Sequence, residues 1–147
     1  MDNMIQGSIK IRPRYDEVDQ MGYVYHANYV RYCHEARTEL FRSYGIPDSV
    51  LEDHGILLPV IEMNLRYIQP AFYDQPLTVN AKIHELPKIK MHVDFTIVNE
   101  ARKTVCESNS TIVFVDKQTR KPMRVPEMVI NAFQPVLKQN KPSEVKL

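Results

Sequence analysis

One stretch of the chain, residues 29–44, has the apolar period of an α-helix and limits how the rest can fold. Its apolar residues recur every three or four positions and would form one stripe along the helix: Tyr29, Cys33, Ala36, Leu40 and Tyr44. On another face, Arg31 and Glu35 are spaced for an i, i+4 ion pair. Gly45 and Pro47 predict the end of the helix, because glycine accepts positive φ and proline cannot continue a helix.

Strand-like alternation fills most of the remaining chain. A first strand is predicted within residues 8–15, where Ile9 and Ile11 alternate with charged residues. Four more strands are predicted after the helix, within residues 58–68, 76–86, 88–100 and 103–116. The connections between the last three are short, which predicts an antiparallel meander.

A five-stranded antiparallel sheet can bury its apolar face by curling around the one long helix. We therefore predict an α+β fold in a single domain spanning residues 1–147. Residues 126–137 predict a short helix that Pro135 disturbs. From about residue 138 the tail is polar, and we expect it to be loosely attached.

The overall composition excludes several classes of function. The formal net charge is +1, so no global charge favours nucleic acid or an anionic membrane as a partner. No run of about 18 apolar residues is present, and the first residues do not resemble a signal peptide. The two cysteines do not form a disulfide framework, which favours a reducing, cytoplasmic location.

Residues that could carry chemistry gather between the first predicted strand and the helix. Asp19 follows the strand in an acidic stretch, and Gly22, one of only four glycines, permits a tight turn or a close approach. His26 lies near the expected helix start. Asn28 is a plausible N-cap, although the helix could equally begin one turn earlier.

This arrangement suits acyl transfer. The free N–H groups at a helix N-terminus carry a partial charge of roughly +0.5 and can stabilise an oxyanion. A carboxylate facing them would act as a base or a nucleophile, not as an acid. Taken alone, however, Asp19 is more often a helix cap, and a single histidine such as His26 is more often a surface or packing residue.

A resemblance decides between these interpretations. The pattern Asp19-x-x-Gly22-x-x-x-His26-x-Asn28-Tyr29, followed by Glu-Ala-Arg-Thr-Glu from residue 35, resembles the signature of hotdog-fold acyl-CoA thioesterases. The most similar group is the 4-hydroxybenzoyl-CoA thioesterase-like branch, which includes the Tol-Pal-associated enzymes. The match is dense over residues 9–45 and implies the hotdog fold, a sheet wrapped around a central helix.

The resemblance also implies roles for individual residues. Asp19 matches the catalytic carboxylate, which is either a nucleophile or a general base for water. His26 matches the residue at the helix start whose backbone N–H polarises the thioester carbonyl. Tyr15 matches a tyrosine that some members need, although an aromatic packing residue at the end of the strand is the simpler interpretation. Gly22 and Tyr25 are expected to contact substrate, and Glu35 is expected to be structural.

Further expectations concern the substrate and the assembly. Lys88 and Lys90 fall where relatives carry basic residues toward the CoA phosphates, and Arg102, Lys103, Arg120 and Lys121 are weaker candidates. Tyr23, Tyr25 and residues 57–60 are expected to line the acyl pocket. Acyl-CoA and acyl-carrier-protein substrates are not distinguished. Hotdog enzymes place their site between subunits, which implies a homodimer or homotetramer.

Two alternatives stay open beside the thioesterase. One is a hotdog hydratase or dehydratase, which the order of Asp19 before His26 disfavours, and the other is a non-catalytic acyl-thioester binding protein. The five histidines show no metal-binding spacing, and no phosphate-cradling glycine loop or Gly-x-Ser-x-Gly motif is present. We therefore expect hydrolysis of acyl-CoA to free acid and CoA, without a metal or an organic cofactor.

Overall fold

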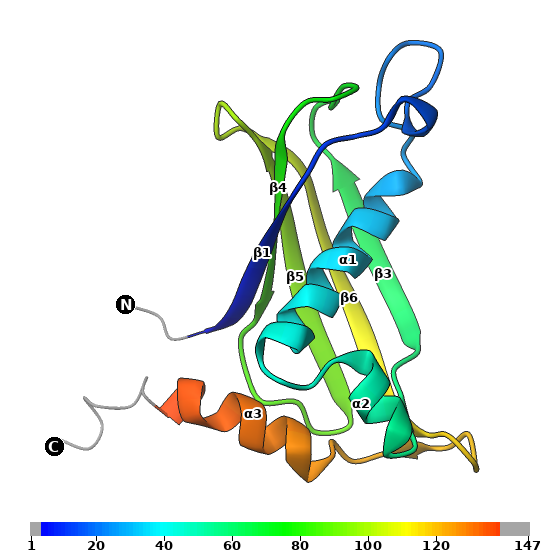
Figure 1. The fold of residues 1–147 in the computed structure, drawn as a ribbon, viewed down its shortest axis with the longest axis vertical. Helices are drawn as coiled ribbons and strands as arrows, with labels where there is room; N and C mark the ends of the chain where they lie inside the picture. The colour runs from blue at the N-terminus through cyan, green and yellow to red at the C-terminus, as the bar shows by residue number, and fades with distance from the viewer. Residues whose placement is uncertain (1–3, 139–147) are drawn as a thin grey trace, which may run out of the picture.

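The computed structural model describes residues 4–138, and its longest helix, α1 (Asn28–Ser43), lies across one face of the sheet (Figure 1). The elements in chain order are β1 (Ile5–Ile11), the 3₁₀ turn η1 (Tyr15–Glu17), α1 (Asn28–Ser43), α2 (Asp48–Asp53), β2 (Ile56–Leu57), β3 (Val60–Tyr67), β4 (Leu77–Ile83), β5 (Lys90–Asn99), β6 (Thr104–Asp116), β7 (Pro122–Met123) and α3 (Glu127–Lys138). Among these described helices, none has the length and apolar character needed to cross a membrane.

The five long strands form one antiparallel sheet in the order β1, β4, β5, β6, β3. The predicted meander is confirmed, because β4 pairs with β5 and β5 pairs with β6. The two-residue strands β2 and β7 extend the pairing at the end of β6. Strands β1 and β3 are therefore the outer long strands, and β3 has β6 as its partner.

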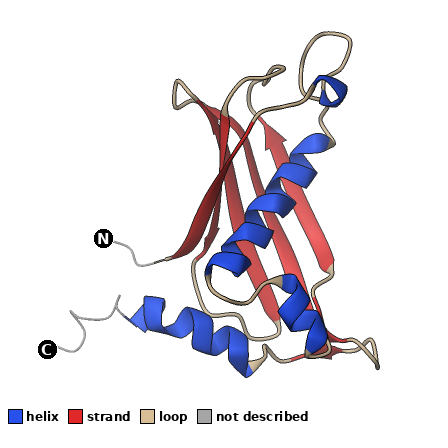
Figure 2. Cartoon of the chain, viewed as in Figure 1, coloured by secondary structure: helices blue, strands red, loops and turns tan. Residues whose placement is uncertain are grey.

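The core lies between α1 and the sheet, which curves around the helix in Figure 2. The predicted stripe is confirmed, since Tyr29, Cys33, Ala36 and Leu40 are all buried. Helix and sheet approach each other closely at Gly7 of β1. A Cβ atom added there would lie 3.4 Å from the Cα of Leu40, which explains a glycine within a strand.

Several predicted details differ from the structure. The first strand begins and ends earlier than predicted. It ends before Pro13, because proline has no N–H to donate to a sheet. Helix α3 continues through Pro135 and is not broken there. Arg31 forms its ion pair with Glu17, at 3.1 Å, and not with Glu35. The predicted polar tail from about residue 138 lies outside the described residues except for its first position.

Candidate active site

The segment between β1 and α1 holds Asp19 on a tight turn. The Gly22 N–H donates to the Asp19 carbonyl oxygen at 2.9 Å, and the Asp19 N–H donates to the Tyr23 carbonyl at 2.7 Å. Gly22 has a φ of +83°, and no atom lies within 4 Å of where its Cβ would be. The turn therefore requires glycine for its backbone conformation and not for space.

The Asp19 carboxylate is fixed through one of its two oxygens. Oδ1 accepts the Met21 N–H at 2.9 Å and the Tyr23 N–H at 3.1 Å. The other oxygen, Oδ2, has no hydrogen-bond partner within residues 4–138, and the side chain is exposed in the single chain. The two N–H donors orient the carboxylate through Oδ1 and leave Oδ2 available as a nucleophile or base.

The start of α1 differs from the prediction at Asn28. The N-cap is Ala27, and Asn28 is the first helical residue. The Asn28 side chain does not cap the helix because its amide donates to the carbonyl of Glu17 at 2.8 Å. Within the described chain, the backbone N–H groups of His26 and Ala27 have no acceptor. These two free N–H groups make the start of α1 a site that can stabilise negative charge developing on a bound substrate.

Aromatic side chains surround this helix start. The ring of His26 lies 4.4 Å from that of Tyr25 and 6.2 Å from that of Tyr67, measured between centroids. The Tyr67 hydroxyl donates to the His26 carbonyl at 3.2 Å, which ties the end of β3 to the start of α1. Burial raises the pKa of Tyr29 to about 12, and the nearby Asp19 carboxylate contributes to the rise. The backbone bonds from Asp19 to Tyr23 and from Tyr25 to Glu17 hold this loop together. Asp19, Tyr25 and His26 therefore lie on one loop that leads into α1.

Tyr15 occupies a more peripheral position. It is 80% exposed, and its ring meets the edge of Tyr73 at a centroid distance of 5.9 Å. No hydrogen bond joins Tyr15 to Asp19 or His26 among residues 4–138. Its catalytic role stays a prediction.

One chain does not bring Lys88 and Lys90 to the loop that holds Asp19. Lys90 of β5 lies opposite Val113 of β6, whereas Tyr67 of β3 lies opposite Cys106, near the other end of β6. Contact of the two lysines with CoA phosphates stays a prediction and would require a second copy of the chain. Among the weaker phosphate candidates, Arg102 and Lys103 lie at the Tyr67 end of β6, whereas Arg120 and Lys121 lie at the other.

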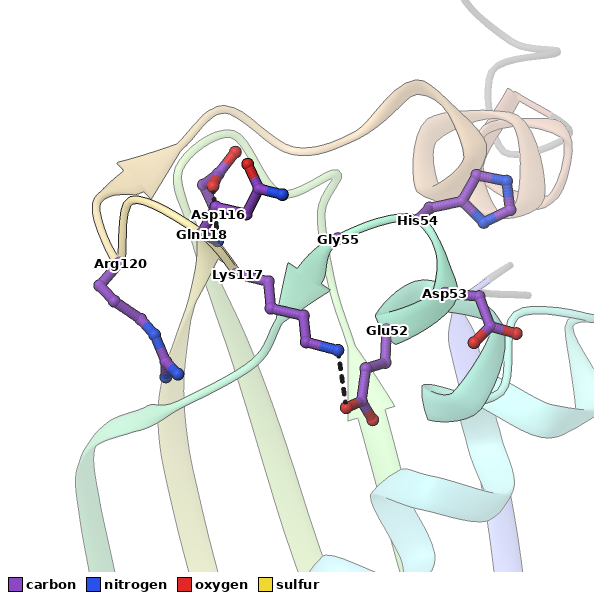
Figure 3. A pocket seen from close by; sticks show the side chains of 8 residues that line it. All are labelled: Glu52, Asp53, His54, Gly55, Asp116, Lys117, Gln118 and Arg120. Carbon is purple, nitrogen blue, oxygen red and sulfur yellow. Dashed lines mark hydrogen bonds and ion pairs between the residues drawn. The ribbon is translucent and has the colours of Figure 1, made fainter.

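A polar depression of about 650 Å³ lies at the far end of β6. Figure 3 shows the side chains that line it. Two of its charged groups pair with each other, since Lys117 lies 3.3 Å from Glu52. The Asp116 carboxylate accepts the backbone N–H groups of Thr119 and Gln118, and these bonds hold the pKa of Asp116 below its usual range. Of the weaker candidates, Arg120 lines this depression, but none of the residues predicted for catalysis does.

A smaller apolar cavity of about 130 Å³ lies between α1 and the sheet. It is lined by Val30, Cys33, His34, Arg37, Val60, Met63, Phe95, Ser110 and Ile112. Val60 was predicted as an acyl-pocket wall together with Tyr25. These two residues lie toward opposite ends of β3, since Val60 begins the strand and Tyr25 neighbours His26. One chain therefore does not assemble the predicted acyl pocket.

Glu17 is the residue that sequence reasoning missed. It lies in the acidic stretch before Asp19, where the sequence predicts no role for it, yet it is 7% exposed and central to the contacts around the site. Its carboxylate accepts hydrogen bonds from Arg14, Arg31 and Tyr32. An acidic residue in a loop has no pattern that signals burial, so only the fold reveals it.

A comparison with protein families matches a region that includes the Asp19 loop and α1. Residues 13–133 match the profile of the Thioesterase-like superfamily, which is well over half of the 147 residues. The chain belongs to the Thioesterase-like superfamily. The resemblance drawn from Asp19 to Tyr29 is thereby confirmed at the level of the family.

Individual members of the superfamily extend this match. YneP of Bacillus subtilis, named as a candidate acyl-CoA thioesterase, is 35% identical over 115 residues, which cover 78% of this chain and 83% of YneP. The acyl-CoA thioester hydrolase YbgC of Escherichia coli O157:H7 is 28% identical over 84% of this chain and 92% of its own. Similarity to members with these names supports thioester hydrolysis as the activity class.

Solved structures confirm the predicted hotdog fold. The DHNA-CoA thioesterase of Staphylococcus aureus superposes with a TM-score of 0.84 at 25% identity, over 97% of this chain and 96% of its own. An Aquifex aeolicus protein described as hypothetical superposes with a TM-score of 0.80 at 28% identity, over 86% and 98% of the two chains. The agreement spans the sheet and α1, the elements that position Asp19 and His26.

Proposed function

We propose that the protein hydrolyses acyl-CoA thioesters to the free acid and CoA, with Asp19 as the catalytic carboxylate. The observation that carries this proposal is the geometry of Asp19. One carboxylate oxygen is fixed by two backbone N–H groups, and the other is unengaged within the described chain. The unpaired N–H groups of His26 and Ala27 supply the complementary donors. The names of YneP and YbgC support the substrate class.

Two routes are compatible with this geometry. In the general-base route, Oδ2 of Asp19 takes a proton from water, and the water oxygen bonds to the thioester carbonyl carbon. In the nucleophilic route, Oδ2 bonds to that carbon and forms a mixed anhydride, which water then hydrolyses. In both routes the carbon–sulfur bond breaks, the CoA thiolate leaves and takes a proton, and the His26 N–H stabilises the oxyanion.

The direct test is thiol release from a panel of acyl-CoAs by the wild type and by Asp19→Asn. The amide keeps the size of the side chain but removes the charge, so it can neither attack nor accept a proton. We expect at least a hundredfold loss of kcat, in line with the about 10²–10⁴-fold contribution of general acid–base catalysis. A substitution that leaves kcat unchanged would contradict the proposed role of Asp19.

The same assay separates the two alternatives. Hydration of an enoyl-CoA without thiol release would favour a hotdog hydratase. Saturable binding of acyl-CoA without turnover would favour a binding protein. The Asp19 carboxylate is oriented by two backbone N–H groups with one oxygen left free, an arrangement that simple binding does not require, and this favours the enzyme.

The remaining parts of the proposal concern the surroundings of the reaction. We infer a cytoplasmic homodimer or homotetramer in which Lys88 and Lys90 of one copy reach the CoA phosphates at the site of another. Tyr15 and the His26 imidazole assist, and Gly22 and Tyr25 contact substrate. No metal or organic cofactor is required, so dialysis against a chelator should leave thiol release unchanged. Assays with acyl-CoA and acyl-carrier-protein substrates of equal chain length decide between the two carriers.

A further inference from the structure

Glu17 is a buried carboxylate that the proposed chemistry does not use. A buried charge is unfavourable unless it is paired and hydrogen-bonded. Three donors satisfy it: the backbone N–H of Arg14 at 2.8 Å, the guanidinium of Arg31 at 3.1 Å and the hydroxyl of Tyr32 at 2.8 Å. Burial, followed by the hydrogen bond to Glu17, raises the pKa of Tyr32. The tyrosine therefore remains a donor at neutral pH.

The backbone carbonyl of Glu17 makes a second set of contacts. It accepts the N–H of Tyr25 at 2.8 Å and the side-chain amide of Asn28 at 2.8 Å. These donors lie on either side of His26, at the start of α1. The side chain of Glu17 thus binds Arg31 and Tyr32 within α1. Its backbone carbonyl binds Tyr25 and Asn28 at the start of the helix.

Asp19 follows Glu17 by two residues on the same loop. A bridge between Val18 and Val24 closes the loop directly after Glu17, and the Asp19 turn lies inside it. The position of Glu17 against α1 therefore determines where the Asp19 carboxylate lies relative to the N–H groups at the helix start. Glu17 itself is enclosed and fully engaged, so it has no free oxygen for substrate.

We infer that Glu17 is a positioning residue that sets the separation between the Asp19 carboxylate and the N–H groups of His26 and Ala27. This inference rests on the proposed thioesterase function. Catalysis by an oriented carboxylate is sensitive to this separation, because a misplacement of about 1 Å can cost about a hundredfold in rate. The ion pair between Arg37 and Asp48 provides a comparison, since it also fixes α1 but at the end remote from Asp19.

The experiment compares Glu17→Gln with Asp48→Asn as a matched control. Each variant replaces a carboxylate that faces an arginine of α1 by an amide of the same size. In Glu17→Gln, one carbonyl oxygen cannot accept from all three donors, so the loop shifts against α1. We expect kcat for thiol release to fall by about tenfold or more, with KM changing less than about threefold. In Asp48→Asn, kcat should stay within about twofold of the wild type.

Amide hydrogen exchange supplies a readout that is independent of activity. Glu17→Gln should accelerate exchange at Tyr25 and Asn28, whose N–H groups bind backbone carbonyls at the helix start. It should also accelerate exchange at Tyr23, whose N–H binds the Asp19 carboxylate. Asp48→Asn should not affect these amides. If Glu17→Gln does not fold, Tyr32→Phe removes one of the three donors and should give a smaller loss of kcat in the same direction.

The outcomes separate this inference from the proposed function. Wild-type kcat in Glu17→Gln, even with a lowered melting temperature, would show a purely structural role and overturn the inference alone. A loss of kcat without faster exchange at residues 19–28 would also overturn it, because Glu17 would then act on the chemistry directly. A wild-type protein that hydrolyses no thioester would overturn the proposed function, and unaltered exchange in Glu17→Gln would then refute the positioning role separately.

Discussion

At the scale of single residues, Gly22 and Asp19 depend on each other. The Asp19 carboxylate accepts N–H groups from residues 21 and 23, and these face it only because the backbone turns at Gly22 with a φ of +83°. A residue with a side chain is strained in this conformation by about 1–2 kcal/mol. The backbone conformation of the loop therefore determines the orientation of the Asp19 carboxylate.

Gly22→Ala tests this dependence, with Gly45→Ala as the matched control. Both glycines have similar positive φ values and open space around the missing Cβ, so each change should lower the free energy of unfolding by about 1–2 kcal/mol. Only Gly22→Ala should lower kcat for thiol release, because Gly45 ends α1 far from Asp19. Denaturant unfolding and thiol-release kinetics measure the two effects. Equal kcat values in the two variants would separate the Gly22 turn from catalysis.

The sequence alone identified Asp19 and Gly22 as candidate site residues, but it did not identify Glu17 or the role of Asn28. Asp19, Gly22 and His26 stand at fixed spacings that resemble a family signature, so a linear sequence reveals them. Glu17 matters because Arg31 and Tyr32, which follow it by 14 and 15 residues, meet it in space. Asn28 turns away from the helix cap for the same reason, since the Glu17 carbonyl competes for its side chain.

At the scale of elements, the apolar period of the sequence predicted the long helix and the central strands but not the residues at which strands begin and end. Helix α1 and strands β4 and β5 follow regular apolar periods, β6 ends in a continuous β-prone run, and the structure confirms all four elements. The bounds of β1 differ from the predicted ones because pairing with β4 sets them, with Ile5 opposite Ile83 and Ile11 opposite Leu77. The alternation predicted for β3 does not lead to full burial, because β3 lies at the edge of the sheet.

The ion pair between α1 and α2 gives a prediction about pH. Arg37 is buried, and its guanidinium makes two hydrogen bonds to Asp48 at 2.7 and 2.9 Å. Burial disfavours the charge of Asp48, but the bonds from Arg37 outweigh this and hold the pKa of Asp48 below its usual range. A carboxyl group with a lowered pKa stabilises the fold above its unfolded-state pKa and loses this effect as the pH falls.

Asp48→Asn should therefore destabilise the fold near neutral pH and much less in acid. Removing one partner of a buried arginine leaves its charge poorly compensated, and the partial exposure of Asp48 moderates the cost to about 1–3 kcal/mol. The difference in free energy of unfolding from the wild type should shrink as the pH falls below about 4. Urea unfolding at several pH values measures it. A difference that is constant between pH 7 and pH 3 would contradict the assigned cause.

At the scale of the whole molecule, the outer edge of β3 is unpaired and apolar. Among the described strands β3 pairs with β6, and its other edge is open. Val60, Ile61 and Tyr67 are each about half exposed, and Ile68 extends the surface beyond the strand. An exposed, apolar edge strand is a template for pairing with another chain. Because Tyr67 also binds the His26 carbonyl, a second copy at this edge would lie beside the start of α1.

Ile61→Lys tests whether a second copy covers this edge. In an isolated chain Ile61 is 53% exposed, so a lysine there should leave the thermal stability of the monomer almost unchanged. Within an interface it would bury a charge and disrupt pairing. We expect the wild type to have at least twice the 17.2 kDa mass of one chain by analytical ultracentrifugation. Ile61→Lys should shift the mass toward one chain and lower thiol release in parallel.

Ile89→Lys is the matched control for this prediction. Ile89 is also a partly exposed isoleucine, but it precedes β5 at the end of the sheet remote from Tyr67. The mass of this variant should equal that of the wild type. A wild-type mass of a single chain, or an unchanged mass in Ile61→Lys, would contradict pairing through β3. A monomeric Ile61→Lys that keeps full kcat would show that one chain contains every group the reaction needs, and Lys88 and Lys90 of a second copy would then have no part in it.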